Sequence, residues 1–580
     1  MSLRNVLWGL LLALMFAVTA AAQEVYPLGA DREVFWDDTM IASMSDCQIL
    51  VHQPVPREVA VTCDKPWEGN NCGYWTVLYD DQAKIYRAYA QGVSFDSGGQ
   101  KGHRLVIVTY ESVDGVHWTR PNVGRFEWEG SKDNNIILFE TASHAECHDF
   151  SPFIDTSPNA KPEARYKAIG FTMDLSGLYA YQSPDGLHWT PISDKPVYTD
   201  GAFDTQNITF WSEKEQKYIL YYRIFSEGGY NGIRIIARAV SDDYLHWTNE
   251  GPILFPEGEE PTEGAQDYVN QILPYYRAPN IYLGFPARYV DNGLIRATEY
   301  LPEWESRQER MKQAQRVGTV ATDSVYITSR DGIHFRRSNE AFLSPGLKTA
   351  GNWSYGDNYL AWSVVETDST RDDCPRELSL YAPESCLTGE VSRLRRYTLR
   401  IDGFGSVHAK NKIGEMTTRP FTFTGKELSL NLGTSAAGFV KMEFLDEAGN
   451  PIPGFTLEEC DMFFGDTLDW RCSWNGSTDV SSLAGKTVSL RFVMHEADLY
   501  SMKFEYRAIL EEKRYFDEIA KCTVGVVILS GGLCVGRGAG GLSARRPARS
   551  VLGRYDGRVD ERLSDPGPSA GAAGTGVCLR

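Results

Sequence analysis

Carboxylates recur at three comparable points of the sequence, each just ahead of a strand-like run. They are Asp149 in HDFSP, Asp204 in DTQN and Asp267 in EGAQDYVNQ, with Glu263 in the last segment as a reserve. Carboxylates brought together in one pocket can act as general acid, general base or nucleophile at a glycosidic bond. An aspartate at the start of a strand also commonly caps a turn, and that alternative stays open for each of them.

Amide and aromatic side chains accompany these acids, as binding of a sugar would require. Amides bind hydroxyl groups, and aromatic rings lie against the face of a sugar ring. The candidates for stacking are Trp75, Trp353 and Tyr355, and those for polar binding are His148, Gln206, Asn207, Asn270 and Gln271. Arg277 and Arg288 are candidates for holding a site carboxylate or a charged substituent of the substrate. The alternative is an ion pair between blades of the propeller that is inferred below.

A short hairpin motif organises the elements that must position these residues. An Asp, usually followed by Gly, precedes a His and an aromatic residue in four copies, at 114–119, 185–190, 243–248 and 331–336. Asp-Gly supplies the positive φ of a tight turn, and each copy follows a strand-like run. The His shared by all copies, including His188, belongs to the turn and is a poor catalytic candidate.

The spacing of the hairpins predicts four-stranded propeller blades. Two more strand candidates precede each hairpin, and a fifth set without the motif ends near residue 402. We therefore expect an all-β protein, with a five-bladed β-propeller over 30–402 and a helical insertion at 301–318. Alternating short strands over 405–510 predict a C-terminal β-sandwich, and 511–580 read as a disordered or anomalous tail.

The chain ends, the net charge and the cysteines indicate where the protein is located and which partners it excludes. Residues 1–22 have the form of a signal peptide, with a membrane anchor as the rival, and predict a secreted or periplasmic protein. The net charge of −19 leaves no basic field for nucleic acid. The cysteines suggest loop disulfides, Cys374 with Cys386 and Cys460 with Cys472. Zinc binding is the rival, but the sequence contains no CxxC pair that would favour it. Oligomeric state is left open.

The propeller with S-x-D-G-x-H-W hairpins, acids at the starts of inner strands and a trailing sandwich resembles glycoside hydrolase families 32, 43 and 68. Its architecture is most similar to family 32, over about residues 30 to 510. The resemblance implies three acids on the axis: a nucleophile or base from blade one, a transition-state stabiliser from blade two and a general acid from blade three. Asp149 would stand at the stabiliser and Asp204 near the general acid.

The chain departs from family 32 in its first blade. That family carries an acid in a W-x-N-D-P-N-G type motif, whereas residues 70–75 here read NNCGYW. We therefore expect a glycoside hydrolase of a plant or algal poly- or oligosaccharide that uses no cofactor. A calcium ion at the axis would suit the architecture, although no EF-hand-type loop announces one. The rivals are a carbohydrate-binding propeller without catalysis and a structural or protein-interaction propeller.

Overall fold

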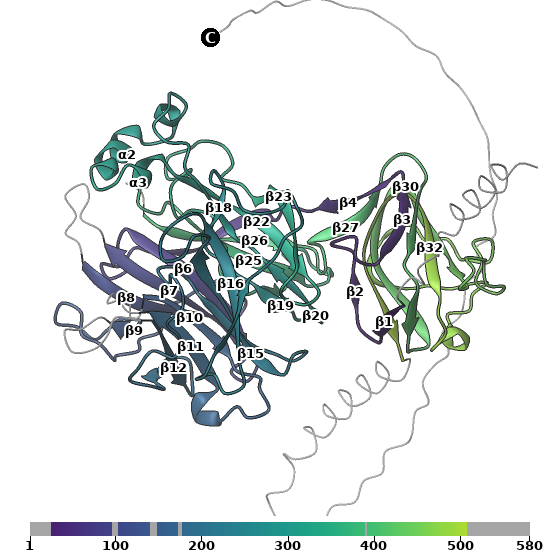
Figure 1. Cartoon of the computed structure of the whole chain (residues 1–580), viewed down its shortest axis with the longest axis horizontal. Coiled ribbons are helices and arrows are strands. Elements are labelled where there is room, and N and C mark those ends of the chain that lie inside the picture. The colour runs from purple at the N-terminus through teal and green to yellow at the C-terminus, as the bar shows by residue number, and fades with distance from the viewer. Residues whose placement is uncertain (1–24, 95–102, 140–147, 172–176, 389–390, 507–580) are drawn as a thin grey trace, which may run out of the picture. The chain divides into compact units, whose positions relative to one another are not determined.

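The computed structural model describes residues 25–94, 103–139, 148–171, 177–388 and 391–506, and in them strands predominate. The expected five-bladed β-propeller is confirmed (Figure 1). The first three blades are four-stranded antiparallel meanders in chain order. Their strands are β6 Asn71–Asp80, β7 Ile85–Ser94, β8 His103–Ser112 and β9 Ile136–Phe139; β10 His148–Ile154, β11 Tyr166–Phe171, β12 Leu178–Ser183 and β13 Thr190–Pro191; and β14 Ile208–Ser212, β15 Lys217–Phe225, β16 Arg234–Ser241 and β17 Thr248–Pro252.

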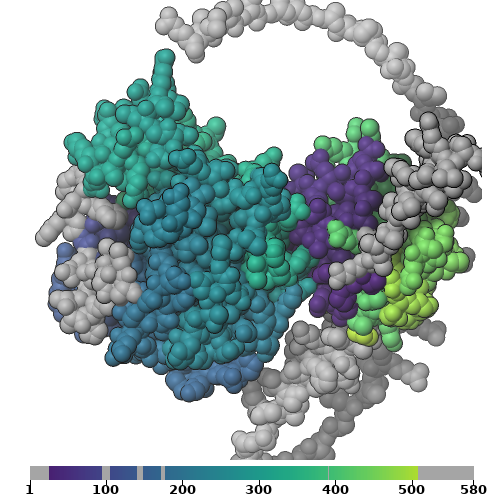
Figure 2. Space-filling model, in the orientation of Figure 1, coloured from purple at the N-terminus to yellow at the C-terminus, as the bar shows by residue number. Residues whose placement is uncertain are grey.

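Blade four has broken inner strands and carries the insertion. Its strands are β18 Gln266–Asp267, β19 Leu273–Tyr275, β20 Ala278–Gly284, β21 Ala287–Val290, β22 Ala321–Ser329 and β23 Phe335–Leu343. Between β21 and β22 lie the helices α2 Trp304–Met311 and α3 Arg316–Thr319, so the expected helical insertion is confirmed. It stands out from the surface of the propeller in the space-filling view (Figure 2).

Blade five is completed by a strand from the start of the chain. Its later strands are β24 Val365–Thr367, β25 Glu377–Glu384 and β26 Arg393–Leu399. The fourth strand is β5 Val55–Thr62, which pairs antiparallel with β26. This pairing closes the ring, because the last blade receives its outer strand from the start of the chain and no sheet edge is left open. The paired residues are more than three hundred positions apart in the sequence.

The segment before β5 belongs elsewhere, which corrects the expected propeller start at residue 30. Strands β1 Tyr26–Gly29, β2 Glu33–Val34, β3 Ile41–Ser45 and β4 Cys47–Val51 pair with strands from the C-terminal part of the described chain. Those partners are β27 Gly405–Ala409, β28 Gly414–Thr418, β29 Phe421–Phe423 and β32 Ser489–Glu505; β30 Glu427–Leu445 and β31 Asp466–Arg471 complete the set. Sequence alternation could not show that the N-terminal strands join this sheet. The two-sheet sandwich itself remains a prediction.

Two further expectations concern cysteines and the chain ends. Every cysteine of the described residues is free, so the expected Cys374–Cys386 and Cys460–Cys472 staples do not form there. Cys374 is exposed whereas Cys386 is buried, and the Cys460 sulfur instead accepts the backbone N–H of Met442 at 3.3 Å. The signal peptide over 1–22 and the tail over 511–580 lie outside the described residues. No helix in the described ranges is long and apolar enough to cross a membrane.

The hairpin motif is a hydrogen-bonded turn that also joins neighbouring blades. In blade two, Asp185 Oδ1 accepts the backbone N–H groups of Leu187 and His188, and Trp189 Nε1 donates to the Gly186 carbonyl at 3.0 Å. The same carbonyl accepts the hydroxyl of Tyr89 from β7 of blade one at 3.1 Å. The Nδ1 atom of His188 lies 2.7 Å from Asp185 Oδ2 in the same turn, and the side chain is 60% exposed, so its role is structural.

The same contact between blades recurs around the ring. Tyr381 of blade five donates to the Gly115 carbonyl of blade one, and Tyr221 of blade three donates to Gly332 of blade four, each at 2.6 Å. Each bond adds a donor from a neighbouring blade to a turn carbonyl; in blade one that carbonyl also accepts the Trp118 indole N–H of its own hairpin at 3.2 Å. The repeated turn therefore fixes the packing of one blade against the next.

Gly186→Ala is expected to lower the free energy of unfolding by about 1–3 kcal/mol or more. Gly186 has φ +75°, and a Cβ there would lie 2.5 Å from Tyr89 Oη. Urea unfolding followed by tryptophan fluorescence measures the loss. Gly130→Ala is the matched control, because Gly130 also has positive φ but its Cβ would meet nothing within 4 Å. Equal losses in the two variants would show that the contact with Tyr89 is unimportant.

Candidate functional site

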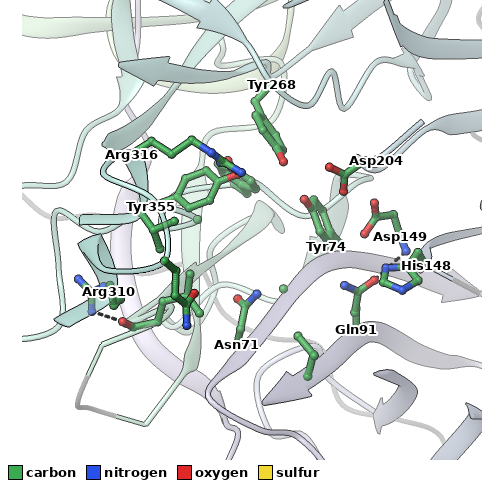
Figure 3. Close-up of a pocket in the computed structure, with 17 residues that line it drawn as sticks. Asn71, Tyr74, Gln91, His148, Asp149, Asp204, Tyr268, Arg310, Arg316 and Tyr355 are labelled. Carbon is green, nitrogen blue, oxygen red and sulfur yellow. Dashed lines mark hydrogen bonds between the residues drawn. The ribbon is translucent and has the colours of Figure 1, made fainter. Parts of the chain in front are cut away.

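A pocket of about 380 Å³ lies where the inner strands of the blades begin (Figure 3). All five blades and the insertion contribute to its wall, so residues far apart in sequence meet there. Its lining includes Asn71, Tyr74 and Gln91 of blade one, His148 and Asp149 of blade two, Asp204 ahead of blade three, Tyr268 of blade four, Tyr355 and Tyr359 ahead of β24, and Arg310, Gln313 and Arg316 of the insertion.

Asp149 is buried at the start of β10 in an unusual backbone conformation. Its φ is +53°, and the pairing of β10 with β11 shifts register between His148 and Ser151. Its N–H donates to Gln91 Oε1 at 2.7 Å, which ties blade two to blade one. The side-chain Oδ2 has no hydrogen-bond partner. The local bend therefore aims an unsatisfied carboxyl group into the pocket, at a conformational cost typical of functional positions.

The electrostatic setting of Asp149 favours its protonated form. Burial raises the pKa of Asp149 well above its usual range, the negative charge of Asp204 raises it further, and Arg223 opposes both effects. Asp204 is exposed to the pocket, in the segment ahead of β14. Figure 3 shows the two carboxyl groups close to one another beside Tyr74. The pocket thus holds a buried carboxyl group that favours its protonated form beside a second carboxyl group that is exposed.

Tyrosines form the aromatic wall. The ring centroids of Tyr268 and Tyr359 are 5.6 Å apart, those of Tyr268 and Tyr355 are 5.9 Å apart, and those of Tyr74 and Tyr359 are 6.2 Å apart. Burial raises the pKa of Tyr74 well above 10, so its phenol is neutral and able to donate a hydrogen bond. This set suits an apolar ring face edged with hydroxyl groups.

Of the expected stacking residues, only Tyr355 lines the pocket. Trp75 is buried against Tyr110, and its indole N–H donates to the Cys72 carbonyl. Trp353 donates to the Gly346 carbonyl and is not part of the lining. The reason at blade one is a positive φ of 52° at Tyr74 within a register shift, which turns Tyr74 to the pocket and Trp75 into the core.

The amides expected to bind hydroxyls are buried structural groups. Gln206 donates to Thr76 Oγ1 at 3.1 Å and to the Tyr74 carbonyl at 3.2 Å, and Gln271 donates to Gln206 Oε1 and the Leu360 carbonyl, both at 2.7 Å. These bonds link the inner strands of four blades. Asn207 donates to the carbonyls of Phe203 and Thr205, and Asn270 to that of Tyr221. None of the four amides lines the pocket.

The remaining acid and arginine candidates also lie elsewhere. Asp267 forms a buried ion pair with Arg337 at 2.9 Å, and Glu263 is exposed in a turn outside the pocket. Arg288 pairs with Asp323 at 2.6 Å, and Arg277 pairs with Asp402 at 3.0 Å. Both arginines therefore form structural ion pairs, although that of Arg288 lies within blade four and not between blades as the alternative expected. Of the expected residues, Asp149, Asp204, His148 and Tyr355 meet in one pocket.

Sequence reasoning missed Tyr74, Gln91, Tyr268 and the arginines of the insertion. Tyr268 follows Asp267 directly, so strand alternation could have placed it on the opposite face from that acid. The charges of the insertion resembled an ordinary solvated helix face. Within the described ranges, no group of three or more His, Cys, Asp or Glu is placed to hold a metal ion, so calcium at the axis stays an expectation from the architecture.

Comparison with known proteins finds similarity only among solved structures. No family profile matches the sequence, and no curated protein matches it. Solved structures similar to it include a fructofuranosidase from Schwanniomyces occidentalis complexed with fructose (13% identity, 77% of this chain and 97% of that one, TM-score 0.37). Others are a thermostable family-43 glycoside hydrolase (14%, 58% and 92%, 0.37) and an N-acetylgalactosamine deacetylase from F. plautii (14%, 62% and 97%, 0.38). These are similarities to two glycosidase structures and one deacetylase structure, all at low sequence identity.

Asp267→Ala should act on stability and spare the pocket. Removing this carboxylate leaves the guanidinium of Arg337 buried and unpaired, which is expected to cost about 3–5 kcal/mol of unfolding free energy. Chemical denaturation measures that loss. The double variant Asp267→Leu with Arg337→Met should recover much of it, because no buried charge then remains. Full stability of Asp267→Ala would contradict the structural assignment.

Proposed function

We propose that the protein is a secreted glycoside hydrolase that cleaves a poly- or oligosaccharide in this pocket. One observation carries the proposal: Asp149 and Asp204, from neighbouring blades, face one aromatic-lined pocket, where Asp149 is buried with a raised pKa and Asp204 is exposed. Glycoside hydrolysis needs one carboxylic acid to protonate the leaving oxygen and one carboxylate on the other side of the reacting carbon. The neutral tyrosine wall offers a surface for the sugar ring.

In the proposed reaction, Asp149 is the general acid. Its buried, protonated carboxyl group donates a proton to the glycosidic oxygen as the bond to the anomeric carbon breaks. Asp204, which is accessible from the pocket, acts as the carboxylate. With inversion, it takes a proton from the water that attacks the anomeric carbon. With retention, it attacks the anomeric carbon itself, and water activated by the deprotonated Asp149 then hydrolyses the glycosyl ester on Asp204 and frees the sugar. This assignment differs from the family resemblance, which implied a stabilising role for Asp149 and the acid role near Asp204.

Asp149→Asn and Asp204→Asn should each lower kcat/KM by a factor of about 10²–10⁴, since each removes a proton-transfer or nucleophilic group. Release of reducing sugar from a panel of plant and algal polysaccharides first identifies the substrate, and purified variants are then compared on it. Glu263→Gln is the matched control, because Glu263 is an exposed acid outside the pocket. Full activity in either aspartate variant would refute the assignment.

The pH dependence of kcat/KM should report the protonation of Asp149. Because the pKa of Asp149 is raised, its acid form persists above the ordinary carboxyl range, and activity falls only as pH rises through that raised pKa. Arg223 lowers the pKa of Asp149, so Arg223→Met should move the alkaline limb to higher pH. The direction of this shift is the test. An alkaline limb that moved to lower pH would mean that the limb does not report the protonation of Asp149.

A carbohydrate-binding propeller without catalysis is the second candidate. It is favoured by the start of the first blade, since residues 70–75 contain no acid where the family resemblance implied one. The two candidates differ in turnover. A binding protein would bind a glycan, as calorimetry would show, yet it would release no reducing sugar on long incubation. Hydrolysis that is abolished by Asp149→Asn supports the enzyme.

A further inference from the structure

Cations without ion-pair partners surround the pocket. Four arginines lie in or beside its wall: Arg223, Arg234, Arg310 and Arg316. Among the residues that the structure describes, none of them has a carboxylate oxygen within 4 Å. Arginines on the outer parts of the blades differ, since Arg87 and Arg238, for example, each contact a glutamate. The pocket therefore concentrates positive charge in a chain whose net charge is −19.

Two of these arginines stack on the aromatic wall. The guanidinium of Arg223 lies 5.2 Å from the centre of the Tyr268 ring, and that of Arg234 lies 5.3 Å from it. Arg223 Nε donates to the Ala202 carbonyl at 2.9 Å, and Arg234 Nη1 donates to Gln266 Oε1 at 2.7 Å. Their hydrogen-bond partners are neutral, and the charge of Arg223 acts on Asp149 and Asp204 only through space.

The other two come from the insertion and line the pocket directly. Arg310 is 5% exposed; its Nη1 donates to Ser306 and to the Leu387 carbonyl, while its Nε and Nη2 have no hydrogen-bond partner. Arg316 is exposed, donates to Tyr355 Oη at 3.5 Å, and has its guanidinium 5.7 Å from the centre of that ring. Arg316 reaches into the pocket from the side opposite Asp149 and Asp204 (Figure 3).

This arrangement gives the pocket two chemically distinct sides. Asp149 and Asp204 are the carboxyl groups of the lining, and burial keeps Asp149 in its neutral form. Across the tyrosine wall stands the planar guanidinium of Arg316, and the buried Arg310 contributes to another part of the lining. A guanidinium fork matches the geometry of a carboxylate or a sulfate. A neutral glycan would gain little from these charges and would leave them unneutralised.

We propose that the substrate is an anionic glycan whose carboxylate or sulfate group binds Arg316 beside Tyr355, with Arg310 adding fixed positive charge. The inference rests on the proposed function for its sugar chemistry, and it names the substrate class for the same pocket. The acidic surface of the chain repels anions in general. The insertion therefore supplies the local charge that admits this ligand.

Binding to matched acidic and neutral glycans tests the proposal. The full chain carrying Asp149→Asn serves as the binding form, because Asn resembles the neutral carboxyl group and prevents turnover. The probes are oligogalacturonates against their methyl esters, and sulfated galactan oligosaccharides against desulfated ones, measured by isothermal titration calorimetry at low salt. We expect one acidic series to bind at least about tenfold more tightly than its neutral partner, and the series that binds identifies carboxylate or sulfate.

Substitutions in the insertion then locate the anion. Arg316→Gln should abolish that tenfold preference without loss of stability, because Arg316 is exposed. Arg310→Lys should keep most of it, whereas Arg310→Gln should weaken it. Arg296→Gln, an exposed arginine of the same region outside the pocket lining, is the control for lost charge and should change nothing.

The outcomes separate this inference from the proposed function. Preferential binding of neutral glycans, no binding of either series, or unchanged acid preference in Arg316→Gln would overturn the anionic-substrate proposal. Hydrolysis is measured separately on the chain with Asp149 intact. Cleavage of a neutral glycan would then keep the proposed function while the anionic inference fails. Tight acidic binding without any cleavage would keep the inference and defeat the catalytic proposal.

Discussion

The pairing of buried amides on the propeller axis is the constraint on which the pocket depends. Inner strands that converge on an axis bring backbone carbonyls together in a space that water cannot freely fill, and each needs a donor. Gln206 and Gln271 supply those donors to Tyr74, Thr76 and Leu360 and bond to one another. The network fixes the spacing of four blades just beside Asp204 and Tyr74. The positions of the pocket residues then follow from the ring and depend little on the loops.

The site gains its chemistry from unfavourable local conditions that the ring maintains. Asp149 and Tyr74 both have positive φ, a conformation that costs non-glycine residues about 1–3 kcal/mol, and both turn their side chains to the pocket. Burial then makes one carboxyl group an acid, while the neighbouring Asp204 remains accessible. Arg223 and Arg310 are buried without a carboxylate within 4 Å among the described residues, which adds a desolvation cost. Strain, a buried acid and such arginines gathered at one place are typical of functional sites.

Repetition and insertion divide the work in this fold. The repeated hairpins and the tyrosine bonds between blades hold the ring, and their residues, His188 among them, are exposed or committed to turns. The helices α2 and α3 interrupt the repeat in one blade only, and they bring Arg310 and Arg316 to the pocket. The shared scaffold thus supports the proposed bond cleavage, whereas the unshared insertion supports the proposed choice of glycan.

The sequence by itself determined the blades, their hairpins and the helical insertion, because these follow from turn chemistry and strand alternation within short windows. It also indicated Asp149 and Asp204 at the starts of blades, but it gave Asp267 the same standing. It could not determine that Val55–Thr62 closes the ring, or that the strands before it join a C-terminal sheet, because such pairing links distant segments. Tertiary structure also decided the fate of equivalent polar residues. Asp267 forms an ion pair with Arg337 and is structural. Gln206 and Gln271 donate hydrogen bonds to backbone carbonyls. Trp75 packs in the core because Tyr74 has a positive φ. A side chain's role here depends on its buried partner, and only the folded chain supplies that partner.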